Sequence, residues 1–303
     1  MKVNINGSGV LLAADLEAQI AHMAEAAADG FERYWLAQVG LTDALTIFAA
    51  AAGRVPDIEM GTAVIPTFNR HPSALAAQAL TAQALTGGRI NLGIGLSHKP
   101  TVEENWGMRF ERPIRHLIDY LEILQALLTE GRVDYHGEIF TCVSEAARPT
   151  DSPPSLLVAA LGPQALKVAG RRTDGTILWM VGPNTIREHV APTIREAAAG
   201  AGRPDPRIVC SLPVLVTDDA AAAREFADVM LENYGTLPSY RAMLDREGAQ
   251  GPGDVCVFGT EEEVLDHLGR IAEAGATEFT AVEFGIDPEA VSRTREVLKA
   301  YNA

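Results

Sequence analysis

The stretch INLGIGLSHK, residues 90–99, joins an apolar run to two glycines and a group of polar side chains. A short apolar run bounded in this way predicts a buried strand. Gly95 can take a backbone conformation closed to other residues, and its lack of a β-carbon lets a ligand approach closely. The backbone N–H groups of Leu96, Ser97 and His98 are then expected to face a binding site at the end of the strand.

Outward from this strand, short apolar runs alternate with helix-spaced segments. Strands are expected at residues 3–6, 34–37, 58–65, 90–95, 155–160, 175–180, 208–216 and 279–284. Helices are expected at residues 15–30, 42–53 (capped by Thr42), 72–85, 112–129, 163–172, 183–201, 218–234, 261–274 and 288–301. Regular alternation predicts parallel strands joined by helical crossovers. Eight such units predict an α/β fold, a (β/α)8 TIM barrel, with a doubly wound open sheet as the alternative.

The chain shows no boundary rich in Pro, Gly or Ser, so residues 1–303 are predicted to form a single domain. Two segments are longer than simple connections require. One covers about residues 97–111, after the fourth strand, and the other about residues 235–259, before the last helix–strand pair. Long excursions in compact domains are often lids or binding loops.

Composition excludes several classes of protein. The formal net charge of −15 argues against a nucleic-acid partner, whose phosphates would be repelled over most of the surface. No run approaches the roughly 20 apolar residues of a membrane span, and MKVNINGSG lacks the pattern of a signal peptide. Three separate cysteines without a CxxC pair suit a reduced compartment. We therefore expect a cytoplasmic protein without a membrane partner.

In a TIM barrel the site lies at the carboxyl ends of the strands. A second loop there, AALGPQAL, has Gly162 at the turn and Pro163 as first helical residue, and a helix N-terminus favours a phosphate. Trp179, at another strand end, is expected either to line a pocket for a flat ring or to pack in the core. Arg70 and His71 precede Pro72, where they either contact a ligand or form the first turn of a helix.

Few side chains in the sequence suit acid–base chemistry. His98 is the best placed titratable group, as an acid, a base or a hydrogen-bond partner of a ring, and simple exposure is its alternative. Glu283 is either catalytic or paired with a neighbouring Arg or Lys. No HExxH, GxSxG, Walker A or metal-spaced cluster occurs, and GIGLSH lacks the third glycine of GxGxxG. The scarcity of acid–base side chains suits chemistry performed by a bound cofactor. No metal is expected.

Three motifs carry a resemblance to a known family: GTAVIPTFNRHP (61–72), LTGGRINLGIG (85–95) and VAALGPQALKVAGRRTDGTIL (158–178). Their order and spacing resemble the bacterial luciferase-like monooxygenase superfamily, in particular its actinobacterial branch that uses coenzyme F420, a deazaflavin. The resemblance extends from the first strand to about residue 200.

The resemblance implies a barrel with a flavin-type ring in its mouth and a homodimer. Family members carry a non-proline cis peptide in a bulge of the third strand, which would fall here at Ala63–Val64. The positions that contact the cofactor phosphate would be Leu96, Ser97 and His98 after one strand. After the next strand they would be Ala160, Leu161 and Gly162.

One departure from the family matters for the substrate. Relatives that oxidise sugar phosphates place an Asp-His pair after the second strand and a Glu after the fourth. Here those positions hold Gln38-Val39 and His98, so His-based sugar-phosphate oxidation is not expected. Gln38 remains able to hydrogen-bond the ring or the substrate. An apolar position opposite the ring suits a reductase of a hydrophobic, electron-poor substrate.

The sequence therefore predicts an F420-dependent oxidoreductase. It would transfer hydride between the reduced deazaflavin and a small, apolar, activated alkene or carbonyl, with His98 or water supplying the proton. One alternative is a monooxygenase of the same fold that uses reduced FMN, and another is a non-catalytic flavin-binding barrel.

Overall fold

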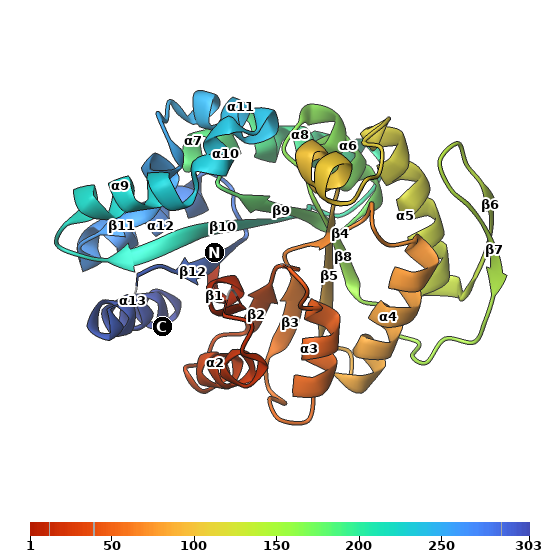
Figure 1. Ribbon diagram of the computed structural model, residues 1–303, viewed down its shortest axis with the longest axis horizontal. Helices are drawn as coiled ribbons and strands as arrows, with labels where there is room; N and C mark the ends of the chain where they lie inside the picture. The colour runs from red at the N-terminus through yellow and green to blue at the C-terminus, as the bar shows by residue number, and fades with distance from the viewer. Residues whose placement is uncertain (12, 39, 286) are drawn as a thin grey trace.

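Eight parallel strands close into a barrel in the computed structural model, which describes residues 1–11, 13–38, 40–285 and 287–303 (Figure 1). Around the ring the strands are β1 (Lys2–Asn6), β2 (Arg33–Leu36), β3 (Glu59–Thr62), β5 (Ile90–Gly95), β8 (Ser155–Ala159), β9 (Gly175–Trp179), β10 (Arg207–Val216) and β12 (Glu278–Glu283). β9 pairs with β10, and β12 pairs with β1, so these eight strands leave no free edge. The predicted (β/α)8 barrel is confirmed, and the open-sheet alternative is wrong.

Helices surround the barrel at nearly all the expected positions (Figure 1). They are α2 (Leu16–Ala28), α3 (Ala44–Ala51), α4 (Pro72–Leu85), α5 (Pro113–Glu130), α6 (Pro163–Arg172), α9 (Ala220–Met230), α12 (Glu261–Glu273) and α13 (Pro288–Asn302). The helix expected at 183–201 consists of α7 (Pro183–Thr185), a π-turn η2 (Ile186–Val190) and α8 (Ala191–Gly200). The cap of α3 is Asp43, whose carboxylate accepts from the Thr46 N–H at 2.8 Å, so the expectation of Thr42 was one residue early.

Both predicted insertions are present. The structure also contains helices and strands that no strong signal in the sequence indicates. The first insertion holds a π-turn, η1 (Thr101–Asn105), and the second holds α11 (Pro238–Glu247), η3 (Pro252–Val255) and β11 (Val257–Gly259). The added elements are α1 (Ser8–Leu11), β4 (Ile65–Pro66), α10 (Glu232–Thr236) and the antiparallel hairpin β6 (Arg132–His136) and β7 (Thr141–Glu145). The hairpin stands away from the barrel (Figure 1) and is largely exposed, so it lacks the apolar runs that identify the barrel strands.

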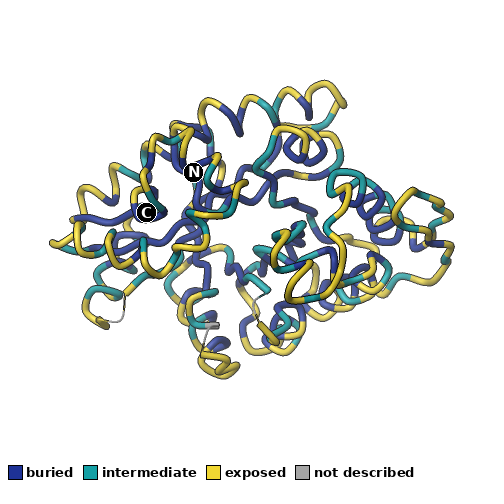
Figure 2. Tube along the Cα trace, turned by 45° about the horizontal axis from the view of Figure 1, so that its top comes forward, coloured by how far each residue is buried: buried dark blue, intermediate teal, exposed yellow. Residues whose placement is uncertain are grey.

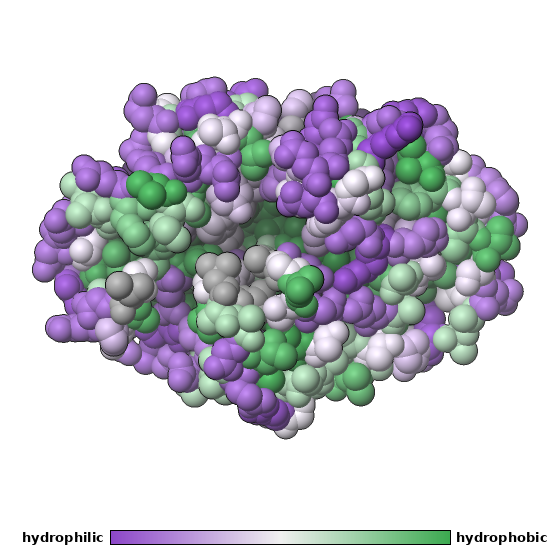
Figure 3. Space-filling model, viewed as in Figure 1, coloured by the Kyte–Doolittle hydropathy of each residue, from purple (hydrophilic) through white to green (hydrophobic). Residues whose placement is uncertain are grey.

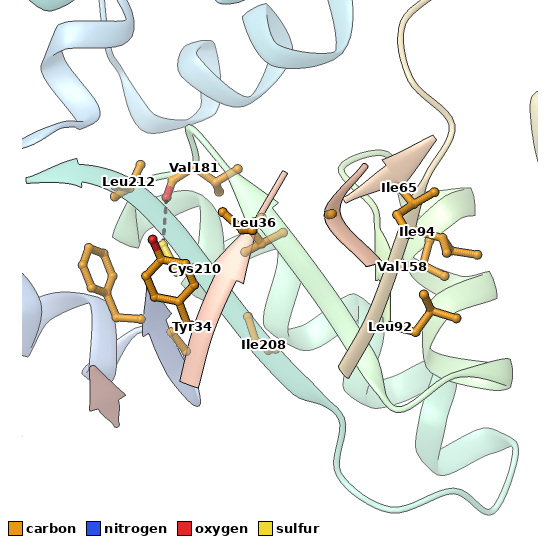
Figure 4. Packing of buried hydrophobic residues seen from close by; sticks show 14 of the residues in the cluster. Tyr34, Leu36, Ile65, Leu92, Ile94, Val158, Val181, Ile208, Cys210 and Leu212 are labelled. Carbon is orange, nitrogen blue, oxygen red and sulfur yellow. Dashed lines mark hydrogen bonds between the residues drawn. The ribbon is translucent and has the colours of Figure 1, made fainter. Parts of the chain in front are cut away.

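Buried residues lie on the barrel strands and on the helix faces that cover them (Figure 2). Outward-facing side chains of neighbouring strands pack together beneath the helices, as Leu92, Ile94 and Val158 show in Figure 4. Side chains alternate along each strand, so the next residues face inward. Inside the barrel, Trp35, Leu157, Ile177 and Val209 form a separate apolar cluster that fills its middle.

A polar layer closes the lower, amino-terminal end of the barrel. Glu278 is 2% exposed, and its carboxylate accepts from Trp35 Nε1 at 2.8 Å and Asn4 Nδ2 at 3.0 Å. It also pairs with Arg33 at 3.1 Å and Arg207 at 3.0 Å. One carboxylate thereby links β1, β2, β10 and β12.

A second buried polar contact ties helix α5 to the loop after β4. His116 Nε2 lies 3.0 Å from Thr67 Oγ1, and the ring stacks on Phe68 with centroids 3.9 Å apart. Burial lowers the pKa of His116 to about 4, although Asp119 opposes the shift. The imidazole is therefore neutral at neutral pH.

We expect Glu278→Ala to destabilise the protein by about 3–5 kcal/mol, because it removes the buried carboxylate that Arg33 and Arg207 share. Urea unfolding followed by circular dichroism measures the loss. The matched control is Glu59→Ala, which also removes a partner of Arg33 but whose side chain is 44% exposed, and it should cost about 1 kcal/mol or less. Equal losses in the two variants would contradict this assignment.

We expect stability to fall as the pH drops from 6.5 towards 4, because the unfolded chain protonates His116 near 6.5 and the folded protein only near 4. The full difference amounts to about 3 kcal/mol for this one group. Urea unfolding at a series of pH values should show a weaker dependence in His116→Phe than in the wild type. An identical dependence in both proteins would show that His116 contributes nothing to it.

Candidate functional site

The carboxyl ends of the barrel strands, with the loops that follow them, form what we call the mouth. Its inner floor consists of small side chains, among them Ala63, Gly95, Ala159 and Ser211. Trp179, at the end of β9, is the large exception. Figure 3 shows a hollow in this face with apolar residues at its base. A flat ring can therefore lie on the floor against Trp179.

A bulge of the third barrel strand supplies part of this floor. The Ala63–Val64 peptide is cis, at the predicted position. The Thr62 hydroxyl accepts from the Gly93 N–H at 2.8 Å and donates to the Gly93 carbonyl at 2.7 Å. This side chain replaces the backbone ladder between β3 and β5, so that Val64 can project towards the barrel interior, where it packs on the apolar cluster.

Packing, and not the backbone conformation expected from the sequence, requires glycine at position 95. Its φ is not in the left-handed region, so the prediction of a glycine-only conformation is wrong. A β-carbon at Gly95 would lie 2.6 Å from Val64 Cγ2 and 3.3 Å from Ala159 Cβ. Glycine is needed because the bulge packs directly on it. The left-handed residue of this loop is Ser97, with φ of 62°.

Two loops with available amides lie side by side, because β5 and β8 are neighbours. The first is Leu96–His98. The second is Ala160–Gly162, where His189 Nε2 hydrogen-bonds the Leu161 carbonyl at 2.8 Å. Gly162 precedes α6 with φ −75° and ψ 154°, and no side chain caps the helix. A β-carbon at Gly162 would meet no described atom within 4 Å, so the helix N-terminus opens onto free space.

His98 stands at the rim beside the rings of two tyrosines, one of which also contacts Trp179. Its ring centroid lies 5.5 Å from that of Tyr240 and 6.5 Å from that of Tyr234. Tyr234 in turn lies 5.9 Å from Trp179. Burial lowers the pKa of His98, and no charged group of the described chain counters it. The imidazole is therefore neutral at neutral pH and only half-buried, so a ligand in the mouth can reach it.

Gln38 occupies the opposite side of the mouth within a polar network. With its amide nitrogen towards Asp43 (3.2 Å), its oxygen accepts from Arg70 at 3.3 Å. Arg70 pairs with Asp43 at 2.9 Å, and Gln78 donates to the same carboxylate at 2.7 Å. The network holds Gln38 in place, and a catalytic role for it stays a prediction. Val39 lies outside the described residues.

A cavity of about 520 Å³ adjoins the mouth at Arg70. Its lining consists of Phe68, Asn69, Arg70, His71, Trp106, Met108 and Phe140. The sequence had singled out Arg70 and His71 only. The aromatic lining comes from the loop after β4 (Phe68), the first insertion (Trp106) and the hairpin turn (Phe140), which approach one another only in the folded chain.

Glu283 is paired with a neighbouring arginine, which was the alternative to a catalytic role. Its carboxylate pairs with Arg295, and it lies 3.0 Å from His22 Nε2. His22 Nδ1 lies 2.6 Å from the Tyr34 hydroxyl. These groups join β12 to α2 and α13, away from the mouth.

Sequence reasoning missed several polar and aromatic groups of the mouth. Asn6 Nδ2, at the end of β1, donates to Ser211 Oγ at 3.1 Å. Tyr240 comes from the second insertion, whose length was the available signal, whereas Tyr234 lies at the end of the helix expected at 218–234 and gave no signal. Within the described ranges, no cluster of three His, Cys, Asp or Glu could hold a metal ion, and no helix has the length and apolarity to cross a membrane.

Comparison with known proteins identifies the family. A family described as luciferase-like monooxygenase matches residues 3–278. An F420-dependent glucose-6-phosphate dehydrogenase of Nocardia farcinica is 32% identical over 167 residues, which cover 52% of this chain and 49% of that protein.

Solved structures share the whole fold at low sequence identity. An F420-dependent secondary alcohol dehydrogenase, in complex with an F420–acetone adduct, aligns with a TM-score of 0.80 at 16% identity, covering 99% of this chain and 98% of that one. The oxygenating constituent of 3,6-diketocamphane monooxygenase from Pseudomonas putida, in complex with FMN, aligns with a TM-score of 0.79 at 16% identity, covering 100% and 98%. With the match over residues 3–278, the chain belongs to the luciferase-like monooxygenase family and is an oxidoreductase of that family.

Proposed function

We propose that the protein is an F420-dependent oxidoreductase acting on a small, apolar, activated alkene or carbonyl. The observation that carries the proposal is the floor of small side chains lying beside two loops with available amides. When bound, a deazaflavin supplies hydride at its ring carbon. The chain itself has to bind the ring and the anionic tail of the cofactor, exclude water and position the substrate.

The residues present fit such a cofactor. Ala63 and Val64 project at the bulge, where a ring can rest on them. The free space over Gly162 and the uncapped N-terminus of α6 suit a phosphate, which backbone N–H groups and the helix dipole attract locally despite the net charge of −15. The amides of Leu96, Ser97 and His98 lie on the neighbouring loop. Ala160 and Leu161 complete the second loop.

His98 and Trp179 bound the space above the floor. The His98 imidazole is largely neutral at neutral pH, so it suits hydrogen bonding and, in its protonated fraction, delivery of a proton. Water is the other proton source. Trp179 offers an apolar wall, and Gln38 offers an amide on the far side of the mouth.

A monooxygenase that uses reduced FMN is the second candidate. The FMN complex with the same fold supports it, because a tricyclic ring of similar shape occupies that related barrel. A homodimer remains an expectation from the family resemblance, and a cytoplasmic location remains a prediction from the sequence.

We expect the purified protein to bind F420 at least about tenfold more tightly than FMN, a difference of about 1.4 kcal/mol. Titrations followed by F420 and FMN fluorescence measure both affinities. F420 binding no tighter than to serum albumin would contradict the proposal. Tight FMN binding with oxygen uptake, when a flavin reductase and NADH are added, would favour the monooxygenase.

We expect Gly162→Asp to change stability and cofactor binding in opposite directions. The backbone at Gly162 suits an N-cap, so the carboxylate would satisfy free N–H groups and stabilise α6 by up to about 1 kcal/mol. The same charge would repel the cofactor phosphate and weaken F420 binding about tenfold or more. Thermal unfolding and fluorescence titration measure the two effects.

The matched control is Gly162→Asn, which caps the helix without the charge and should lose less affinity. Unchanged F420 binding in Gly162→Asp would place the phosphate elsewhere.

A further inference from the structure

Four aromatic rings stand on one side of the mouth, and we call them the aromatic wall: His98, Trp179, Tyr234 and Tyr240. Tyr234 is central, with ring centroids 4.9 Å from Tyr240, 5.9 Å from Trp179 and 6.5 Å from His98. Tyr240 is buried behind it, whereas the other three rings are half-buried. The wall therefore presents ring surfaces to the mouth over the β5–β8–β9 sector.

The support of Tyr234 differs from that of its neighbours. It lies on α10, a short helix without a buried residue, which sits over the barrel end in Figure 1. The adjacent α11 is held firmly, because the Glu247 carboxylate accepts from the Asn184 N–H at 3.1 Å and the Thr185 N–H at 2.8 Å. Thus α11 is anchored to α7, and Tyr234 reaches the wall from the short helix between α9 and α11.

The wall carries no charge at neutral pH. Burial raises the pKa of the Tyr234 hydroxyl and lowers the pKa of His98, so both groups are neutral. The carboxylate of the nearby Glu247 accepts hydrogen bonds from the backbone amides of α7. A charged substrate would lose its hydration against these rings without gaining an ion pair, and that loss is costly.

We propose that Tyr234 is the specificity-determining residue of the mouth, closing it against Trp179 and His98 so that flat, uncharged substrates are selected. The proposal rests on the proposed function for the identity of the bound ring. Tyr234 reaches the mouth only through its contacts with the rings of Trp179, His98 and Tyr240, so its substitution is tested with the cofactor site saturated. A planar conjugated ketone gains edge-to-face packing on the ring of Tyr234. A variant with a smaller side chain at position 234 does not offer this interaction.

The test uses the F420-loaded protein and two probes with the same conjugated frame. Benzylideneacetone is flat and uncharged, and trans-cinnamate replaces its ketone by a carboxylate. Isothermal titration should show that the wild type binds the ketone about tenfold or more tightly than cinnamate. We expect Tyr234→Phe to keep this preference. In Tyr234→Ala, we expect ketone affinity to fall about fivefold to tenfold and the preference to shrink.

Asn233→Ala, an exposed neighbour on α10, is the matched control and should bind both probes as the wild type does. All four proteins are titrated with F420 at a saturating concentration, and their thermal midpoints should stay constant, which separates lost selectivity from lost cofactor and from misfolding. Tyr234→Leu repeats the test with a bulkier apolar side chain, should Tyr234→Ala unfold. An unchanged preference in the alanine and leucine variants, or a wild type that prefers cinnamate or binds neither probe, would overturn the inference.

Failure of the proposed function would look different. In that case the wild type would not bind F420, and the same probe titrations on the cofactor-free protein would still decide the role of Tyr234.

Discussion

The buried carboxylate of Glu278 is the interaction on which the architecture depends. It takes hydrogen bonds or ion pairs from Asn4, Arg33, Trp35 and Arg207, which lie on three other strands of the ring. A buried carboxylate is tolerated only when such partners surround it. Their convergence aligns the strands at the lower end of the barrel and closes it. Only the carboxyl end is left open to a ligand.

Above this layer, space is made by small residues placed next to large ones. A β-carbon at Gly61 would lie 2.3 Å from Trp35 Cε3, so the indole fills the middle of the barrel because residue 61 is glycine. A β-carbon at Gly93 would lie 2.0 Å from the Thr62 carbonyl oxygen. The bulge at Ala63–Val64 can approach β5 for this reason. The same glycines that allow close packing below therefore shape the floor above.

The mouth combines two different electrostatic environments. On one side, backbone amides at the ends of β5 and β8 can hold an anion in an acidic protein, because their dipoles act at short range. In the same sector, the rings of Trp179 and Tyr234 beside these amides are uncharged. A cofactor with an anionic tail and an apolar substrate suit these two environments, and the polar network of Gln38, Arg70 and Asp43 lies on the opposite side of the mouth.

The sequence by itself determined the order of strands and helices, because hydrophobic periodicity is local. Seven of the eight barrel strands lie within one or two residues of their predicted positions, and the third stops at Thr62, where the bulge begins. The two loops at Leu96–His98 and Ala160–Gly162 were also identified, and the cis peptide at Ala63–Val64 followed from the family resemblance.

Only the tertiary structure decided which distant groups meet. Tyr240 packs on His98 at the rim of the mouth, Glu247 caps α7, and Phe140 of the hairpin turn joins the cavity beside Arg70. These contacts depend on ring closure and on the docking of insertions, which no local pattern encodes. The role of Gly95 changed for the same reason. Its local sequence suggested an unusual backbone, whereas the neighbour that requires glycine there is Val64, brought in by the adjacent strand.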